Sequence, residues 1–179
     1  MNDPRPDTPD TPDAADETVT DGDLAVLATQ LGRTPRGVVG IAARCPAGHP
    51  LVVRTLPRLD DGTPFPTVFY LTGPSVVAAS STLEANGVMR EMTERLTVDE
   101  ELAAAYRRAH EHYLAEREAL GHVDEIDGIS AGGMPTRVKC LHVLVAHALA
   151  AGPGVQPLGD EAIARMAADG LWDRTRCTC

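Results

Sequence analysis

The pattern of hydrophobic residues differs between the first and second parts of the chain. Apolar residues that recur every three or four positions are typical of a helix, and β-branched runs bounded by Gly and Pro are typical of strands. These patterns predict, in order, a helix over 23–31 and strands over 37–43, 51–56 and 67–72. The first two strands form a β-hairpin, and Pro64 and Pro66 place the entry of the third at a sheet edge or in a loop.

From Pro74 onward the period is helical. The predicted helices cover 75–86, 88–96, 98–120, 135–151 and 161–168. An acidic loop separates the third of these from the fourth. Strands followed by helices are typical of α+β proteins, so we expect a small antiparallel sheet of about three strands covered by about five or six helices.

Length and charge favour one folded domain with two tails. A chain of 179 residues can bury a single core. The net charge is −10, but residues 1–23 carry eight acids against Arg5 and contribute −7 of it. This Pro-rich acidic composition predicts a disordered tail over 1–22. The expected domain covers 23–170, and a C-terminal tail with a Cys-x-Cys motif covers 171–179.

Neither a signal peptide nor a membrane span is expected. No stretch reaches the roughly 18 to 20 continuous apolar residues of a transmembrane helix, and the N-terminus lacks the basic and apolar regions of a signal peptide. We therefore expect a cytoplasmic protein with reduced cysteines. Nothing in the sequence suggests DNA binding.

The segment 132–150 contains the densest candidate chemistry. Two glycines precede Pro135, and proline is favoured in the first turn of a helix, so we predict that a helix begins there. Free N–H groups at a helix start attract anions, and two cations follow, Arg137 and Lys139. The segment therefore predicts an anion site for a phosphate-bearing ligand.

Helix geometry separates the sulfur and the imidazoles on this predicted helix. At about 100° per residue, Cys140 and His142 point to opposite faces, and Cys140 and His147 lie about 10 Å apart along the axis. A metal clamp on this helix is therefore rejected. Cys140 and His147 are expected to face the core, and one alternative makes Cys140 a nucleophile with His110 or His147 as its base.

The long helix predicted over 98–120 carries a mixed stripe on one face. Its members follow spacings of four, three and four residues: Tyr106, His110, Tyr113 and Arg117. Rings and donors in a row suit the wall of a groove, with Arg117 and His110 binding an anion. The alternative is ordinary core packing with Arg117 reaching solvent. We combine His110, Tyr113 and Arg117 with Arg137 and Lys139 in one candidate ligand site.

Metal binding has two further candidates. The spacing Cys45-x3-His49 together with Cys177-x-Cys179 offers four zinc-type ligands. The alternative is that the first pair is simply part of a hairpin turn and the second part of a loose C-terminal tail. Cys45 and Cys140 are a second possible pair, for zinc or iron, if the fold brings them together. The sequence contains no hydrolase elbow, zincin motif, nucleotide-binding loop or zinc-finger spacing.

Several blocks of this chain resemble an actinobacterial family, domain of unknown function 501. The most specific block is Gly133 to His142 with Ala146 and His147, and the others include Arg44 to Pro46 and 61–67. The resemblance covers about residues 23–165. It implies genes encoded beside a septum-formation initiator and an exopolyphosphatase-like enzyme, with no established activity.

That context, together with the candidate anion site, leads to a working hypothesis. We expect a binding or regulatory module that recognises a phosphate-bearing ligand, such as polyphosphate, or a partner protein. A cysteine-dependent hydrolase or transferase and a metal-binding protein remain alternatives. The resemblance also implies a Cys or His at the position of Gly73, so a metal site shared with the family would lose a ligand here.

Overall fold

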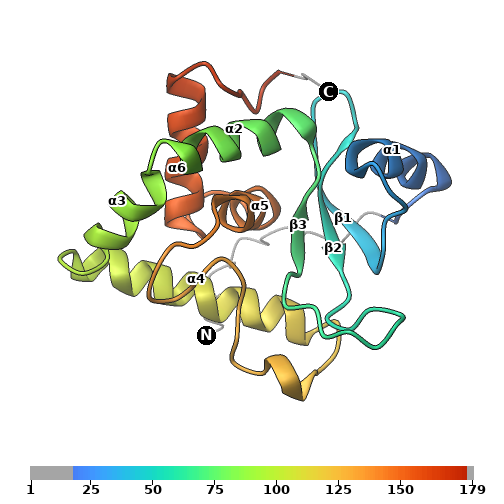
Figure 1. Ribbon diagram of the computed structural model, residues 1–179, viewed down its shortest axis with the longest axis horizontal. Helices are drawn as coiled ribbons and strands as arrows, with labels where there is room; N and C mark the ends of the chain where they lie inside the picture. Colours follow the sequence, from blue (N-terminus) through green and yellow to red (C-terminus); the bar gives the residue numbers. More distant parts are fainter. Residues whose placement is uncertain (1–17, 177–179) are drawn as a thin grey trace, which may run out of the picture.

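The fold is α+β, as the sequence predicted. The structure, a computed structural model, describes residues 18–176 and contains six α-helices, one 3-10 helix and a three-stranded antiparallel sheet over that range (Figure 1). The elements are α1 (Asp21–Leu31), β1 (Val38–Arg44), β2 (Pro50–Thr55), β3 (Phe69–Leu71), α2 (Pro74–Ala85), α3 (Val88–Arg95), α4 (Glu100–Glu118), η1 (Asp124–Ile126), α5 (Leu141–Ala151) and α6 (Pro157–Ala168). The expected N-terminal disorder therefore lies mostly outside the described residues.

The sheet has the order β1-β2-β3, so the predicted hairpin and the edge position of the third strand are both confirmed. Strand β2 pairs with both neighbours, and its Val53 lies opposite Ile41 on one side and Tyr70 on the other. Because side chains alternate along a strand, consecutive residues of β2 serve two different cores. Val52 joins the large core and Val53 joins a small one.

Helices cover the two faces of the sheet unequally. Helix α1 lies on one face, where Leu27 packs with Ile41 and Val53 in the small core (Figure 1). Helix α5 lies on the other face and contacts β3, α2 and α6. Seven of its eleven residues are buried, which makes α5 the centre of the large core. Trp172, beyond the expected domain end at residue 170, is also buried in that core.

Helix α1 is fixed at its start by a capping box. The Thr20 hydroxyl accepts the N–H of Asp23, and the Asp23 carboxylate accepts the N–H of Thr20. The same carboxylate accepts two hydrogen bonds from Arg44 of β1, which holds the pKa of Asp23 far below its usual range. The pair therefore attaches α1 to the sheet.

The helix predicted to begin at Pro135 begins at Leu141 instead, and this prediction was wrong. Residues 132–139 form a closed turn in which the N–H of Lys139 donates to the Gly132 carbonyl at 2.7 Å. The Val138 side chain is buried, and its N–H donates to Thr93 of α3. Tertiary contacts thus replace the helical hydrogen bonds that proline spacing suggested. None of the helices in residues 18–176 is both long and apolar enough to cross a membrane.

Helices α5 and α6 approach each other most closely at Gly159. A Cβ atom at this position would lie 2.2 Å from the Leu144 carbonyl oxygen and 2.8 Å from the Ala148 Cβ. The contact is between backbones, so neither partner can rotate away. The absence of a side chain at Gly159 therefore sets the distance between the two helices.

We predict that Gly159→Ala lowers the free energy of unfolding by about 2–3 kcal/mol, because overpacking outweighs the gain of helix propensity. Urea unfolding of both proteins measures the difference. Gly22→Ala is the matched control, since the nearest atom to its Cβ is 3.6 Å away in an exposed helix turn. A Gly159→Ala protein that is as stable as the Gly22→Ala protein would contradict this packing.

Candidate functional site

Three metal-ligand side chains gather at the start of α5. Within residues 18–176, Glu84, Cys140 and His142 are the only group of three or more such residues whose ligand atoms all lie within 4.8 Å of one another. The Cys140 Sγ lies 3.8 Å from the His142 Nδ1, and the Glu84 Oε1 lies 3.1 Å from the same nitrogen. Each side chain is only partly buried.

The meeting of Cys140 and His142 corrects the prediction that they point to opposite faces. That geometry required both residues to be helical. Cys140 is instead the N-cap of α5, with φ −155° and ψ 116°, an extended conformation. An extended residue before the first helical turn turns its side chain back toward that turn, so the sulfur reaches His142.

Helix α2 supplies the third member and fixes the other two. The Glu84 carboxylate accepts the N–H of Leu141 at 2.6 Å, which satisfies a free donor of the α5 start. The Ser81 hydroxyl, one turn earlier, lies 3.3 Å from the His142 Nε2. Both ring nitrogens therefore have partners, which orients the imidazole.

The electrostatic environment favours a charged imidazole when the site contains protein atoms alone. Hydrogen bonding to Cys140, followed by Glu84, raises the pKa of His142 to about 9, although burial opposes this shift. The charged imidazole pairs with the Glu84 carboxylate. Its stability contribution is fully present below the ordinary value of 6.5 and is lost as pH rises through about 9.

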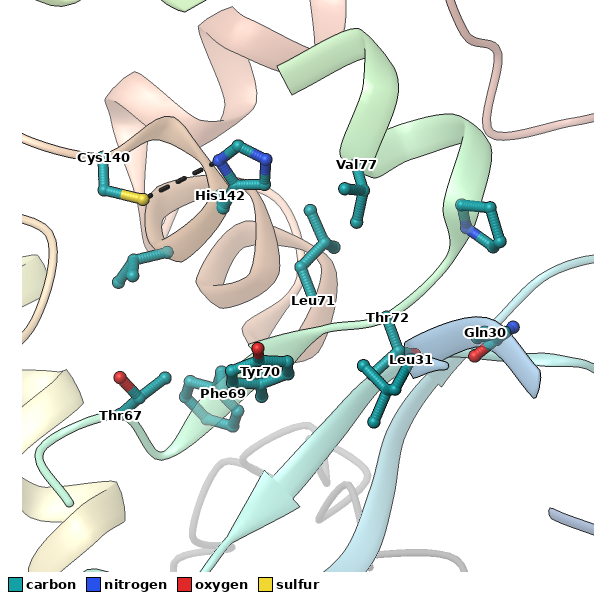
Figure 2. Close-up of a pocket in the computed structure, with 12 residues that line it drawn as sticks. Gln30, Leu31, Thr67, Phe69, Tyr70, Leu71, Thr72, Val77, Cys140 and His142 are labelled. Carbon is teal, nitrogen blue, oxygen red and sulfur yellow. Dashed lines mark hydrogen bonds between the residues drawn. The ribbon is translucent and has the colours of Figure 1, made fainter. Parts of the chain in front are cut away.

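A cavity of about 420 Å³ opens beside this cluster (Figure 2). Cys140 and His142 line one end of it (Figure 2). Gln30 from α1 and Thr72, which follows β3, line the opposite end (Figure 2). The other lining residues are Thr67 and Tyr70, which carry hydroxyls, and six apolar ones: Leu31, Phe69, Leu71, Pro74, Val77 and Val143.

The direction of the contacts decides what the cluster can do. In a catalytic triad, nucleophile and carboxylate bind opposite nitrogens of the imidazole. Here the sulfur and the carboxylate both approach Nδ1. Three donor atoms around one point are the arrangement of a metal site.

The predicted anion site at residues 135–139 does not have free N–H groups at a helix start. The N–H groups of Arg137, Val138 and Lys139 donate to Gly133, Thr93 and Gly132, in that order. The side chains of Arg137 and Lys139 are exposed. The anion at the true helix start, Leu141, is the carboxylate of Glu84.

The side chains of the α4 stripe contact other segments of the chain, and its tyrosines are packed in the core, as the alternative interpretation expected. The Tyr106 hydroxyl donates to the Arg137 carbonyl, and His110 contacts the Ser130 hydroxyl at 2.9 Å. Arg117 is 3% exposed and donates to the carbonyls of Ile126 and Ile129. Tyr113 is fully buried and accepts the N–H of Val68. Tyr106, His110 and Arg117 thus hold the segment 126–137 against α4, and Tyr113 binds the residue before β3.

The two histidines expected to serve Cys140 lie elsewhere. His110 contacts Ser130, and burial lowers its pKa. His147 is fully buried, where its Nε2 lies 3.0 Å from the His112 Nδ1 and its ring stacks on Phe69. The ring that contacts Cys140 is His142, which the sequence analysis assigned to another face.

The other cysteine candidates form no common site with Cys140 in the described part of the chain. Cys45 is buried, and its sulfur lies 3.8 Å from the His49 Nδ1. It is not a member of the cluster around Cys140. Cys177 and Cys179 lie outside the described residues.

Comparison with known families identifies the chain. A family model described as a protein of unknown function, DUF501, matches residues 41–164, more than half of the sequence. The chain belongs to this family. The match begins at residue 41, whereas the sequence resemblance was placed from about residue 23. No curated protein and no solved structure gives a significant match.

Membership in DUF501 covers every residue of the Glu84, Cys140 and His142 cluster, together with Ser81 and Thr72. Gln30 and Leu31, the residues of α1 that line the cavity, lie before the matched region. No local pattern points to Glu84, because it lies 56 residues before Cys140 in an ordinary helix pattern. Only the packing of α2 on α5 brings it to the cluster.

The buried histidine gives a test of the core. The Gln156 amide N–H donates to the His147 Nδ1, so the single ring proton lies on Nε2 and is shared with His112. Tyr113 packs edge-on against the ring, and His112 lies near Glu116, which pairs with Arg54. Burial, followed by repulsion from His112, lowers the pKa of His147 to about 3.

We predict that this histidine destabilises the fold in acid. Between pH 6.5 and 3, His147 binds a proton in the unfolded state but remains neutral in the folded state. Its contribution to the free energy of unfolding is therefore fully present above pH 6.5 and is lost as pH falls. One such group lowers the free energy of unfolding by at most about 1.4 kcal/mol per pH unit. Urea unfolding from pH 7 to 5 should show a shallower slope in His147→Gln than in the unmodified protein. Equal slopes would contradict a neutral buried His147.

Proposed function

We propose that this DUF501 protein binds zinc through Glu84, Cys140 and His142, beside a cavity that takes a small ligand. The observation that carries the proposal is the convergence of sulfur, nitrogen and oxygen donors on one point. Thiolate, imidazole and carboxylate are the groups that zinc prefers in proteins.

The spacing of the donor atoms supports a tetrahedral ion. Ordinary zinc bond lengths put a sulfur and a nitrogen ligand about 3.6 Å apart, and a nitrogen and an oxygen ligand about 3.4 Å apart. The corresponding distances here are 3.8 Å and 3.1 Å. Shifts of a few tenths of an ångström bring these two distances to the tetrahedral values.

The surroundings supply the second layer of a metal site. Histidine ligands of metals usually bind a second partner through the opposite ring nitrogen, and carboxylate ligands are themselves hydrogen-bonded. Ser81 occupies the first position and the Leu141 N–H occupies the second. Such contacts orient the ligands before the ion arrives.

The number of ligands favours a reactive ion over a purely structural one. Structural zinc sites are closed by four protein ligands, whereas catalytic sites have three and leave one position open. Cys140 and His142 line the cavity, so the open position would face it. Zinc in such a position polarises a carbonyl group or activates water. A zinc-dependent hydrolase acting on a small molecule is therefore the function that this geometry supports best.

Thiol chemistry is the second candidate, and one contact favours it. Cys140 lines the cavity and touches an imidazole, and a neighbouring imidazolium stabilises a thiolate. The base in that case is His142 in place of His110 or His147. Rapid iodoacetamide labelling of Cys140 that added zinc does not slow would favour this function over zinc binding.

We predict that the protein, produced without a metal-affinity tag, retains about one zinc ion per chain. Elemental analysis measures the content, and cobalt substitution should give a thiolate charge-transfer band that disappears in Cys140→Ser. Loss of one ligand in Cys140→Ser or His142→Ala should weaken zinc binding at least about 100-fold.

Two controls separate this site from its alternatives. Glu84→Gln retains an oxygen that can accept the Leu141 N–H, so this variant should fold normally. If the carboxylate is a zinc ligand, the variant should nevertheless bind zinc more weakly than the unmodified protein. Cys45→Ala should keep the full zinc content. Equal zinc loss in Cys45→Ala and Cys140→Ser would instead support the pair of cysteines that the sequence suggested. Zinc affinity that Cys140→Ser leaves unchanged would end the proposal.

A further inference from the structure

Two residues at the end of the cavity opposite Cys140 each carry a buried polar atom without a hydrogen-bond partner. Within residues 18–176 only three buried side-chain oxygen or nitrogen atoms have no hydrogen bond, and two of them, Gln30 Oε1 and Thr72 Oγ1, belong to residues that line this cavity. Native structures satisfy nearly all buried polar groups, so each exception needs a cause. Two exceptions in one cavity point to a shared cause.

The hydrogen bond of the Gln30 amide nitrogen fixes the orientation of the amide group. Its Nε2 donates to the Pro50 carbonyl at 2.9 Å, so the oxygen cannot exchange places with the nitrogen without losing that bond. Oε1 is therefore a fixed acceptor. A group that satisfies it must carry an N–H or O–H.

Thr72 is fixed in a similar way by its backbone. Its N–H donates to the Leu51 carbonyl at 2.8 Å, and the residue is 2% exposed. Its hydroxyl both donates and accepts. Gln30 and Thr72 are thus held by the carbonyls of two consecutive residues of β2, Pro50 and Leu51. Together they match an amide or a hydroxyl group.

The residues at this end favour an uncharged ligand group. Gln30 and Thr72 are neutral, and the side chains between them and Cys140 are largely apolar. A charged group here would lose its hydration without an opposite charge to compensate. A cavity of about 420 Å³ is within the range of small-molecule sites.

We propose that the cavity binds a small, neutral, mostly apolar molecule that coordinates the metal at one end and presents an amide or hydroxyl group to Gln30 and Thr72 at the other. This inference rests on the proposed zinc site only for the end of the cavity at Cys140 and His142. The recognition of the second end depends on α1 and the end of β3. Figure 2 shows the two ends on opposite sides of the cavity.

The test uses hydroxamic acids, whose head groups coordinate zinc. A series of straight-chain hydroxamates of increasing length, each ending in a hydroxyl group, is compared with the series ending in a methyl group. Calorimetry on the zinc-loaded full-length protein measures both affinities. At the length that spans the cavity, the hydroxyl compound should bind about tenfold more tightly than its methyl partner, as one neutral hydrogen bond in a dry site provides.

Thr72→Val removes the hydroxyl at constant shape, and it should reduce this preference while leaving the methyl series unchanged, and Gln30→Met should reduce it as well. It should also keep or raise the melting temperature, because the hydroxyl has no protein partner to lose. Thr55→Val is the matched control. Thr55 is 3% exposed, but its hydroxyl donates to the Thr67 carbonyl, so its removal should lower the melting temperature.

The outcomes separate the two proposals. Protein that does not bind zinc at Cys140 overturns the proposed function. Protein that binds zinc there but no hydroxamate, or that binds both series equally at every length, overturns the inference about the ligand and leaves the zinc site intact. A hydroxyl preference that persists undiminished in Thr72→Val and in Gln30→Met also overturns it.

Discussion

The hydrogen bond from the Leu141 N–H to the Glu84 carboxylate is the contact on which the site depends. A buried helix start needs acceptors for its free N–H groups, and α5 obtains one from α2 instead of from its own N-cap residue, Cys140. This arrangement leaves the cysteine side chain available. It also puts a carboxylate where His142, one residue further on, can reach it. One capping contact therefore joins two helices and collects three metal-type ligands.

Much of the fold follows from local sequence signals. The hairpin, the edge strand and most of the helices were predicted with small boundary errors, because β-branched runs and helical periods are local properties. The start of α5 was not. Gly132, Gly133 and Pro135 are typical of the residues before a helix, but Val138 is buried and Lys139 bonds back to Gly132. These contacts involve chain segments that no local pattern reveals.

The same error explains the missed site. A helical Cys140 would point away from His142, but Cys140 is extended and its sulfur contacts that ring. Arg117 shows the opposite case, since the sequence predicts a row of donors on α4. These donors bind the backbone of 126–137. A donor row indicates that carbonyl or anionic groups are near, and only the tertiary structure tells whether they belong to the chain itself.

The two unequal cores have a consequence for entry into the cavity. Helix α1 contributes Gln30 and Leu31 to the cavity wall, yet its own packing on the sheet rests on the small cluster around Leu27 and on the ion pair between Asp23 and Arg44. The opposite wall belongs to α5, in the middle of the large core. Of the two walls, α1 is thus the one whose displacement disrupts less apolar contact. A ligand that contacts both walls would therefore add to the few interactions that hold α1 on the sheet.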